Sequence, residues 1–253
     1  NVSLDTYFAM ARGTASAPAM EMTKWFDTNY HYIVPELHAD QTFKLSSNRL
    51  VEEFTEAKGL GIITRPVIIG PVTYLLLAKS KDNGLTNTLD LLDKVLPAYI
   101  ELLAALTAAG ADWVQIDEPM LTLISMDRER QAYKKAYDLL AGIGTNILIA
   151  TYFEGVKDTL DLITSLPVQG LHIDLVRAPE QLDAVIAQTP QDRVLSLGVL
   201  DGRNIWRTDL TKTYEYIAKA KKTHQGPIQI APSCSLLHVP VDLNNETQLD
   251  REL

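Results

Sequence analysis

Several short apolar runs end in polar side chains that could act as acids, bases, nucleophiles or metal ligands. These residues are Asp117, Glu118, Asp174, Asp201, Arg203, Cys234 and His238. Adjacent carboxylates can serve as a general acid and base, and a thiolate can act as a nucleophile. Thiolate, imidazole and carboxylate groups can also bind zinc. The sequence therefore predicts a carboxylate-lined edge that carries one thiol, an imidazole and an arginine.

Each candidate also has a structural interpretation. The Asp117–Glu118 pair could be an acid–base couple, or could cap the next helix or pair with an arginine. Cys234 could be a nucleophile or a ligand, although a lone cysteine at a strand end is more often a small core residue. His238, in an apolar LLHVP context, could be a ligand, although such an imidazole more often packs or forms a hydrogen bond. His172 is expected to be a satisfied interior histidine.

A second group of candidates lies in two loops. Lys24 is followed by Trp25 and Phe26, a combination that suits an anionic, ring-bearing ligand, unless Lys24 is simply solvated. Asp201 and Arg203 lie in the Gly-flanked run GVLDGRNIW. Arg203 could bind a carboxylate there, or could form an ion pair that fixes the loop.

These residues need a scaffold of alternating strands and helices. The apolar runs lack the alternation of a half-exposed strand, which is typical of strands buried on both faces of a parallel sheet. We expect strands at Val67–Gly70, Trp113–Ile116, Ile147–Tyr152, Leu171–Leu175, Val194–Val199 and Ile228–Ala231. We expect helices at Leu85–Ala109 (kinked or divided near Pro97), Arg128–Ala141, Val156–Leu166, Pro179–Gln188 and Leu210–Thr223, the last capped by Asp209.

The pattern predicts a single α/β domain over residues 1–253. Residues 67–240 form successive β-α units of a TIM (β/α)₈ barrel that is truncated at its N-terminal end. An open doubly wound sheet is the alternative. Residues 1–66 form a loop and excursion region with a helix, in which Ala11–Ala19 is a loop and Met22–Leu37 is an extended excursion at the barrel mouth. Residues 241–253 begin a further, truncated helix.

Composition limits the class of protein. The 253 residues carry a net charge of −9, which disfavours a nucleic-acid partner. No apolar run is long enough to cross a membrane, so we expect a soluble protein without a membrane partner. The single cysteine allows no internal disulfide, which is consistent with a cytoplasmic location.

Seven ordered strings together resemble one enzyme family, the cobalamin-independent methionine synthases. They are EMTKWFDTNYHYIVPE, GPVTYLL, WVQIDEP, TYFEG, LPVQGLHIDLV, GVLDGRNIWR and APSCSLLH. The resemblance covers nearly the whole chain and is to the N-terminal barrel of these two-barrel methyltransferases. It implies transfer of a methyl group from 5-methyltetrahydropteroyltriglutamate to homocysteine. It also implies that this chain supports the folate and is not catalytic without the C-terminal barrel of the same polypeptide.

The resemblance further implies one binding residue and no metal site in this chain. Lys24 matches the family's folate-contacting lysine in EMTKW, and no catalytic residue is expected here. The catalytic barrel binds zinc through His, Cys, Glu and Cys, and alignment of the two barrels places Ile149, Thr151, Asp174 and Cys234 at those positions. A purely structural module, and an independent small barrel enzyme that uses Asp117, Glu118 and Cys234, are the alternatives.

Overall fold

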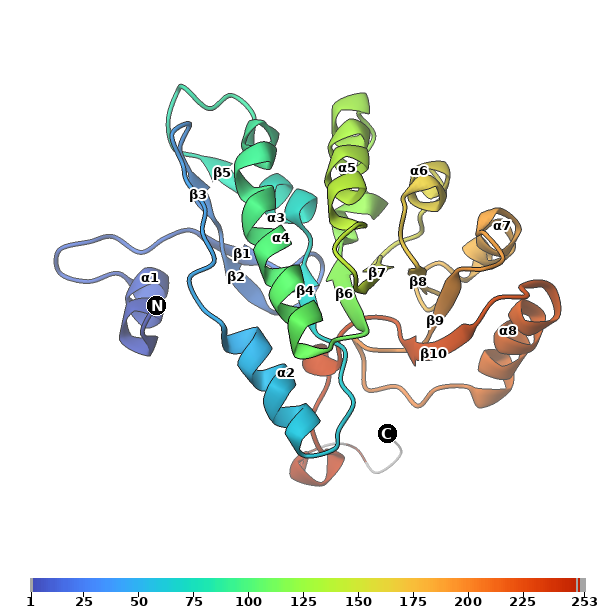
Figure 1. Ribbon diagram of the computed structural model, residues 1–253. Helices are drawn as coiled ribbons and strands as arrows, with labels where there is room; N and C mark the ends of the chain where they lie inside the picture. The colour runs from blue at the N-terminus through green and yellow to red at the C-terminus, as the bar shows by residue number, and fades with distance from the viewer. Residues whose placement is uncertain (1, 249, 251–253) are drawn as a thin grey trace.

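A six-stranded parallel sheet forms the centre of the computed structural model, which describes residues 2–248 and 250 (Figure 1). Its order is β10-β9-β8-β7-β6-β4. The strands are β4 (Val67–Ile69), β6 (Trp113–Asp117), β7 (Asn146–Ala150), β8 (Gly170–Asp174), β9 (Val194–Leu200) and β10 (Ile228–Pro232). All six predicted strands are therefore present, with ends that shift by one or two residues.

The sheet has the winding of a barrel. Each strand pairs with the next one along the chain, without the reversal of order that defines a doubly wound sheet, so the alternative fold is wrong. The barrel is not closed, because β4 and β10 are the two edges of the sheet and do not pair with each other. Arg65 and Gln229 nevertheless bridge this opening, since Nη2 of Arg65 donates to Oε1 of Gln229 at 3.0 Å.

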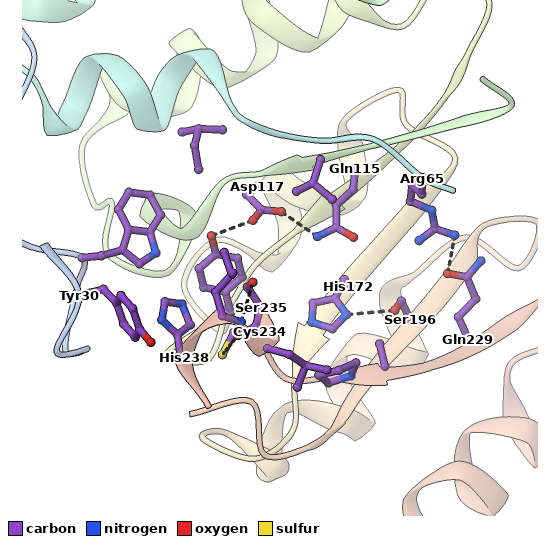
Figure 2. Close-up of a pocket in the computed structure, with 18 of the residues that line it drawn as sticks. Tyr30, Arg65, Gln115, Asp117, His172, Ser196, Gln229, Cys234, Ser235 and His238 are labelled. Atoms are coloured by element: carbon purple, nitrogen blue, oxygen red, sulfur yellow. Dashed lines mark hydrogen bonds between the residues drawn. The ribbon is translucent and has the colours of Figure 1, made fainter. Parts of the chain in front are cut away.

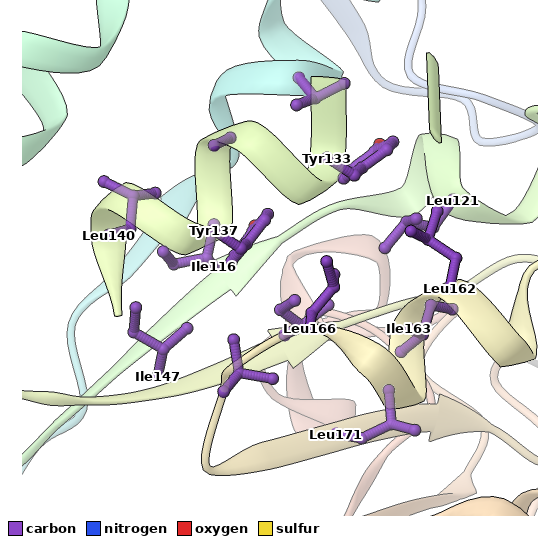
Figure 3. Packing of buried hydrophobic residues seen from close by; sticks show 14 of the residues in the cluster. Ile116, Leu121, Tyr133, Tyr137, Leu140, Ile147, Leu162, Ile163, Leu166 and Leu171 are labelled. Carbon is purple, nitrogen blue, oxygen red and sulfur yellow. The ribbon is translucent and has the colours of Figure 1, made fainter. Parts of the chain in front are cut away.

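Helices follow the strands along the outer, convex side of the sheet (Figure 1). They are α4 (Leu92–Ala109), α5 (Asp127–Leu140), α6 (Leu160–Ser165), α7 (Leu182–Gln188) and α8 (Leu210–Thr223). Their apolar faces bury Leu140, Leu162 and Ile163 against Ile116, Ile147 and Leu171 of the strands (Figure 3). The outer layer and the sheet thus share one hydrophobic core, which fixes the strand ends in space.

Several helix boundaries differ from the prediction. The Leu85–Ala109 segment divides into a 3-10 turn, Thr88–Leu91, and α4, but the division does not lie at Pro97, which is inside α4. The Val156–Leu166 helix begins only at Leu160, because the Val156 amide is held by Oε1 of Gln181 instead of a helical carbonyl. A 3-10 turn, Pro179–Gln181, precedes α7, whereas α8 begins after the Asp209 cap as predicted.

The remaining segments precede β4 or join it to α4, and Leu37, Phe54, Val72 and Leu75 from them are part of this core. They comprise α1 (Leu4–Arg12), an antiparallel hairpin of β1 (Met22–Lys24) and β2 (His31–Ile33), β3 (Glu36–Leu37), α2 (Arg49–Gly59), α3 (Pro71–Leu77) and β5 (Lys79–Ser80). The Met22–Leu37 excursion is extended, as predicted. The loop predicted for Ala11–Ala19 is wrong at its start, because Ser3 caps a helix that continues through Arg12.

The C-terminal tail departs from the prediction of a helix start. Its described part contains a 3-10 turn, Leu243–Asn245, which Asp242 caps, and residues 249 and 251–253 lie outside the described residues. Within the described part of the chain, no helix has both the length and the apolar character needed to cross a membrane.

Candidate functional site

The concave side of the sheet encloses a cavity of about 1250 Å³ (Figure 2). Its wall includes both edge strands, the hairpin residues Trp25 and His31, and the ends of the central strands. Four of the predicted candidates line it, because parallel strands place their carboxyl ends at one edge; they are Asp117, His172, Cys234 and His238. The cavity is therefore the candidate functional site.

Asp117 faces this cavity. Its two carboxylate oxygens accept hydrogen bonds from Nε2 of Gln115 at 2.8 Å and from the Tyr152 hydroxyl at 2.9 Å (Figure 2). Burial raises the pKa of Asp117 to about 6, although both hydrogen bonds favour its charged form. Asp117 therefore retains the capacity to exchange a proton near neutral pH.

Glu118 points the other way, into the layer of helices. Its side chain is fully buried and accepts hydrogen bonds from the hydroxyls of Tyr133 and Tyr137 at 3.1 and 3.0 Å. It also accepts from the backbone amide of Thr73 at 2.8 Å. Burial raises the pKa of Glu118 to about 7. The acid–base couple predicted as one interpretation of Asp117 and Glu118 is therefore wrong, because the two carboxyl groups do not reach a common substrate atom.

The role of Glu118 is to cap a helix, but not the one that follows it. Thr73 is the third residue of α3, and Gly70, at the N-cap of α3, has no side chain with which to cap it. Glu118, which directly follows β6, supplies the missing acceptor. A β-carbon on Gly70 would lie 2.0 Å from Cδ of Glu118, so the capping contact requires glycine at position 70.

His172 is a satisfied interior histidine, as predicted, although its ring also lines the cavity. Nε2 lies 3.2 Å from the carbonyl oxygen of Ser233 and Nδ1 lies 3.0 Å from Oγ of Ser196. Because a carbonyl can only accept, Nε2 carries the proton and Nδ1 accepts from Ser196. Burial lowers the pKa of His172 to about 4, so the ring is neutral near pH 7.

Cys234 and His238 both have packing roles. Cys234 is buried in a small cluster with Ala150, Tyr152 and Phe153, and burial raises the pKa of its thiol to about 12. His238 packs edge-on against Tyr30 and Phe153, with ring centroids 5.2 and 5.9 Å away. A thiol with this pKa is a poor nucleophile at neutral pH.

The four positions that align with the zinc ligands do not fit a metal ion. Both oxygens of Asp174 are occupied by backbone amides, those of Val176 and Arg177 at 2.9 Å and that of Phe153 at 3.1 Å. Ile149 has no donor atom, and the Thr151 hydroxyl donates to the carbonyl oxygen of His172. Within residues 2–248 and 250, no group of three or more His, Cys, Asp or Glu side chains is placed to hold a metal ion.

The Asp201–Arg203 loop is held by contacts that the sequence did not reveal. Asp201 accepts from the backbone amides of Arg203 and Asn204, so its carboxylate shapes the turn. The guanidinium of Arg203 instead contacts Asp27, in the turn of the β1–β2 hairpin, and Nη1 donates to Oδ2 at 2.7 Å. Arg177 donates to the same oxygen at 2.8 Å. Sequence reasoning missed Asp27 and Arg177, because their separation along the chain is 150 residues.

Lys24 lies at the exposed end of β1, where it pairs with His31 of β2. His31 lines the cavity, and residues directly opposite in an antiparallel pair have β-carbons about 5 Å apart. Among the described residues, the Lys24 side chain has no hydrogen bond or ion pair. The hairpin thus places beside the cavity mouth a cation that is available to bind an anionic ligand.

Comparison with known proteins places this arrangement in a family. Residues 1–225 match the family described as cobalamin-independent synthase, N-terminal domain. The chain belongs to this family. Over 266 residues it is 55% identical to a 5-methyltetrahydropteroyltriglutamate–homocysteine methyltransferase of Chelativorans sp. (strain BNC1). The aligned residues cover 100% of this chain and 34% of that protein.

Further relatives agree on the family and on the fold. A protein of the same name from Rhodopseudomonas palustris (strain ATCC BAA-98 / CGA009) is 54% identical and is covered to 35%. The chain therefore spans about a third of the length of the curated relatives that it matches. The solved structure of a B12-independent methionine synthase from Shewanella sp. W3-18-1, in complex with selenomethionine, superposes with a TM-score of 0.68. At 14% identity, over 88% of this chain and 70% of that one, this likeness shows the fold alone.

Proposed function

We propose that this chain holds the polyglutamate tail of the folate substrate in a methyltransferase that converts homocysteine to methionine. The methyl donor would be 5-methyltetrahydropteroyltriglutamate, the compound in the names of relatives that are 55% and 54% identical to the whole chain. The chain would act by binding, and transfer would require another part of the polypeptide. The expected partner within that polypeptide is a C-terminal barrel.

The observation that carries the proposal is the position of Lys24. It is an exposed ammonium without a hydrogen bond or ion pair among the described residues, on a hairpin whose turn contacts the loops after β7, β8 and β9. A triglutamate tail carries several carboxylates, and a flexible ammonium can follow such a tail as a point charge. Contacts to a remote part of a substrate place its reacting atoms, so a tail contact can serve catalysis without touching the methyl group.

Zinc and cellular location are part of the same proposal. The family resemblance implies a zinc ion in the C-terminal barrel, and the misfit of Asp174 and Cys234 to a metal agrees with that position. A cytoplasmic location is supported by the presence of only one cysteine in 253 residues.

The test compares folate substrates with one and three glutamates, in the whole polypeptide that carries this sequence. We expect Lys24→Ala to raise KM for the triglutamate about tenfold, the cost of one hydrogen bond to a charged group, and to leave KM for the monoglutamate unchanged. Added salt should reduce the difference. Lys222→Ala, at the exposed end of α8, is the control.

Two outcomes would contradict this role for Lys24. An unchanged KM for the triglutamate in Lys24→Ala would mean that the lysine is only solvated and that this chain is a structural module. Equal losses for both substrates would mean that the substitution perturbs the fold instead of a tail contact.

A further inference from the structure

Asp27 ties the Lys24 hairpin to the barrel through two arginines that come from different strand ends. Its Oδ2 atom accepts from Arg177, after β8, at 2.8 Å and from Arg203, after β9, at 2.7 Å. Nη2 of Arg203 also donates to the backbone carbonyl of Asp27 at 3.3 Å. The Arg203 side chain is only 18% exposed, so this contact is partly shielded from water and salt. One carboxylate therefore fixes the hairpin turn to two loops at once.

A ring contact reinforces this connection. Phe26 packs on Phe153, which follows β7, with ring centroids 5.6 Å apart. Both residues have left-handed backbone conformations, with φ of 51° and 75°. Such conformations are costly for bulky residues and persist where surrounding contacts hold them. The turn is thus held against three consecutive strand ends.

Within the hairpin, short-range hydrogen bonds fix the turn that contains Asp27 to the end of β1. The Trp25 amide donates to the carbonyl oxygen of Tyr30 at 2.7 Å, and the Thr28 hydroxyl donates to the carbonyl oxygen of Trp25 at 2.7 Å. Lys24 directly precedes Trp25 at the end of the paired segment. A shift of Asp27 relative to the barrel would therefore move Lys24 relative to the cavity mouth.

The charges of the four side chains that these ion pairs join cancel, which leaves them a geometric contribution. Arg177 also lies 3.6 Å from Glu154, which gives two guanidinium groups and two carboxylates in one cluster. A cluster with no net charge adds little to the long-range attraction of an anionic tail. The contribution that remains is the placement of Lys24.

We propose that Asp27, clamped between Arg177 and Arg203, is a positioning residue that sets the distance between Lys24 and the carboxylates of the folate tail. This inference rests on the proposed function, because it concerns the same tail. It assigns Asp27 no contact with the substrate. Its effect is exerted entirely through the hairpin that carries Lys24.

Substitutions with opposite effects on local charge separate positioning from electrostatics. Asp27→Ala leaves an excess positive charge beside the mouth, whereas Arg203→Gln leaves an excess negative charge. If the cluster acted through its field, the first variant would bind the anionic tail more tightly and the second more weakly. If it positions Lys24, both variants bind the tail more weakly.

The experiment measures KM and kcat for the triglutamate and monoglutamate substrates in the whole polypeptide. We expect Asp27→Ala and Arg203→Gln each to raise KM for the triglutamate about threefold, the value of a partly exposed ion pair, with kcat and the monoglutamate KM unchanged. In a Lys24→Ala background neither substitution should have a further effect. Asp27→Asn, which keeps the shape of the side chain, should have a smaller effect.

A matched control removes a similar ion pair elsewhere. Arg130 and Asp161 join α5 to α6 and combine a largely buried arginine with an exposed aspartate, as Arg203 and Asp27 do. Asp161→Ala should leave both KM values unchanged. Thermal unfolding of each variant identifies any that fail to fold. If Asp27→Ala fails to fold, the KM values of Asp27→Asn take its place in the comparison.

The outcomes distinguish this inference from the proposed function. A lower KM for the triglutamate in Asp27→Ala would overturn the positioning role and leave the function of Lys24 intact. So would wild-type KM values in all Asp27 and Arg203 variants, if Lys24→Ala raises the KM for the triglutamate. Additive losses in the Lys24→Ala background would also overturn it. An unchanged KM for the triglutamate in Lys24→Ala would overturn the proposed function.

Discussion

The carboxyl groups of Asp117 and Glu118, adjacent in sequence at the end of β6, lie on opposite sides of the sheet. Asp117 faces the cavity, where it accepts from Gln115 and Tyr152, and Glu118 enters the helix layer, where it accepts from Tyr133, Tyr137 and Thr73. This geometry follows from the alternation of side chains along a strand. The two carboxyl groups, which the sequence suggests could form one catalytic pair, therefore have separate roles: Asp117 lines the cavity and Glu118 caps α3.

Glu118 should make stability depend on pH. Its pKa is 4.5 in the unfolded chain and about 7 in the folded protein, so between these values the folded state binds more protons. The free energy of unfolding should therefore fall as pH rises from 4.5 to 7, by about 1–3 kcal/mol from this group. Denaturant unfolding at several pH values should show that fall in the difference between wild type and Glu118→Gln.

The comparison with Glu118→Gln isolates one group among several that titrate. Asp117, with its pKa raised to about 6, acts in the same direction. His172, with its pKa lowered to about 4, acts in the opposite direction, because the unfolded chain binds its proton first as pH falls below 6.5. Both remain in the variant, so their effects cancel in the difference. A difference between the two proteins that does not vary with pH would contradict the prediction.

Gly70→Ala should destabilise the fold through Glu118. The new β-carbon would lie 2.0 Å from Cδ of Glu118, so the carboxyl group would be pushed away from the α3 amide that it caps. We expect a loss of about 1–3 kcal/mol, the usual cost of overpacking, measured by denaturant unfolding.

Two further variants identify the source of that loss. Gly142→Ala, at a glycine whose β-carbon would meet nothing within 4 Å, should be close to neutral. In a Glu118→Ala background, Gly70→Ala should cost much less than in wild type. Equal costs in both backgrounds would mean that position 70 is sensitive for another reason.

Cys234 should resist alkylation in the folded chain. A rise of its thiol pKa from 9 to about 12 lowers the thiolate fraction at pH 8 at least about a hundredfold, and burial further limits access. Mass spectrometry after iodoacetamide treatment should find this single thiol unmodified in buffer and modified in denaturant. Rapid modification of the native chain would show that the Cys234 cluster opens readily.

The open edges of the sheet should promote self-association of the 253-residue chain. Val67 and Ile69 on β4 are 48% and 37% exposed, and Ile230 on β10 is 59% exposed. Unpaired strand edges with apolar side chains tend to pair with other chains. Sedimentation of the 28.1 kDa chain should show oligomers that increase with concentration, and Val67→Lys with Ile230→Lys should reduce them. A monodisperse monomer at all concentrations would contradict this expectation.

The sequence was sufficient for the strands and insufficient for the partners of polar side chains. Buried apolar runs such as Val194–Val199 identify a strand locally, and Asp209 identifies a helix start, because both signals lie within a few residues. The direction of Glu118 and the contact between Asp27 and Arg203 depend on segments that only the fold brings together. The helix predicted to begin at Val156 is wrong at its start for the same reason, because the partner of the Val156 amide, Gln181, lies 25 residues away.

The long reach of the Asp27 clamp has a consequence for synthesis of the chain. Asp27 and Arg203 are 176 residues apart, so at about 5–20 residues per second the aspartate emerges from the ribosome about 10 to 35 s before its partner. The β4–β9 units can pair in order of emergence, each with its predecessor, while the hairpin waits. The hairpin that carries Lys24 is thus translated early and can dock on Arg203 only after β9 has emerged, which makes this docking a late step on the folding pathway.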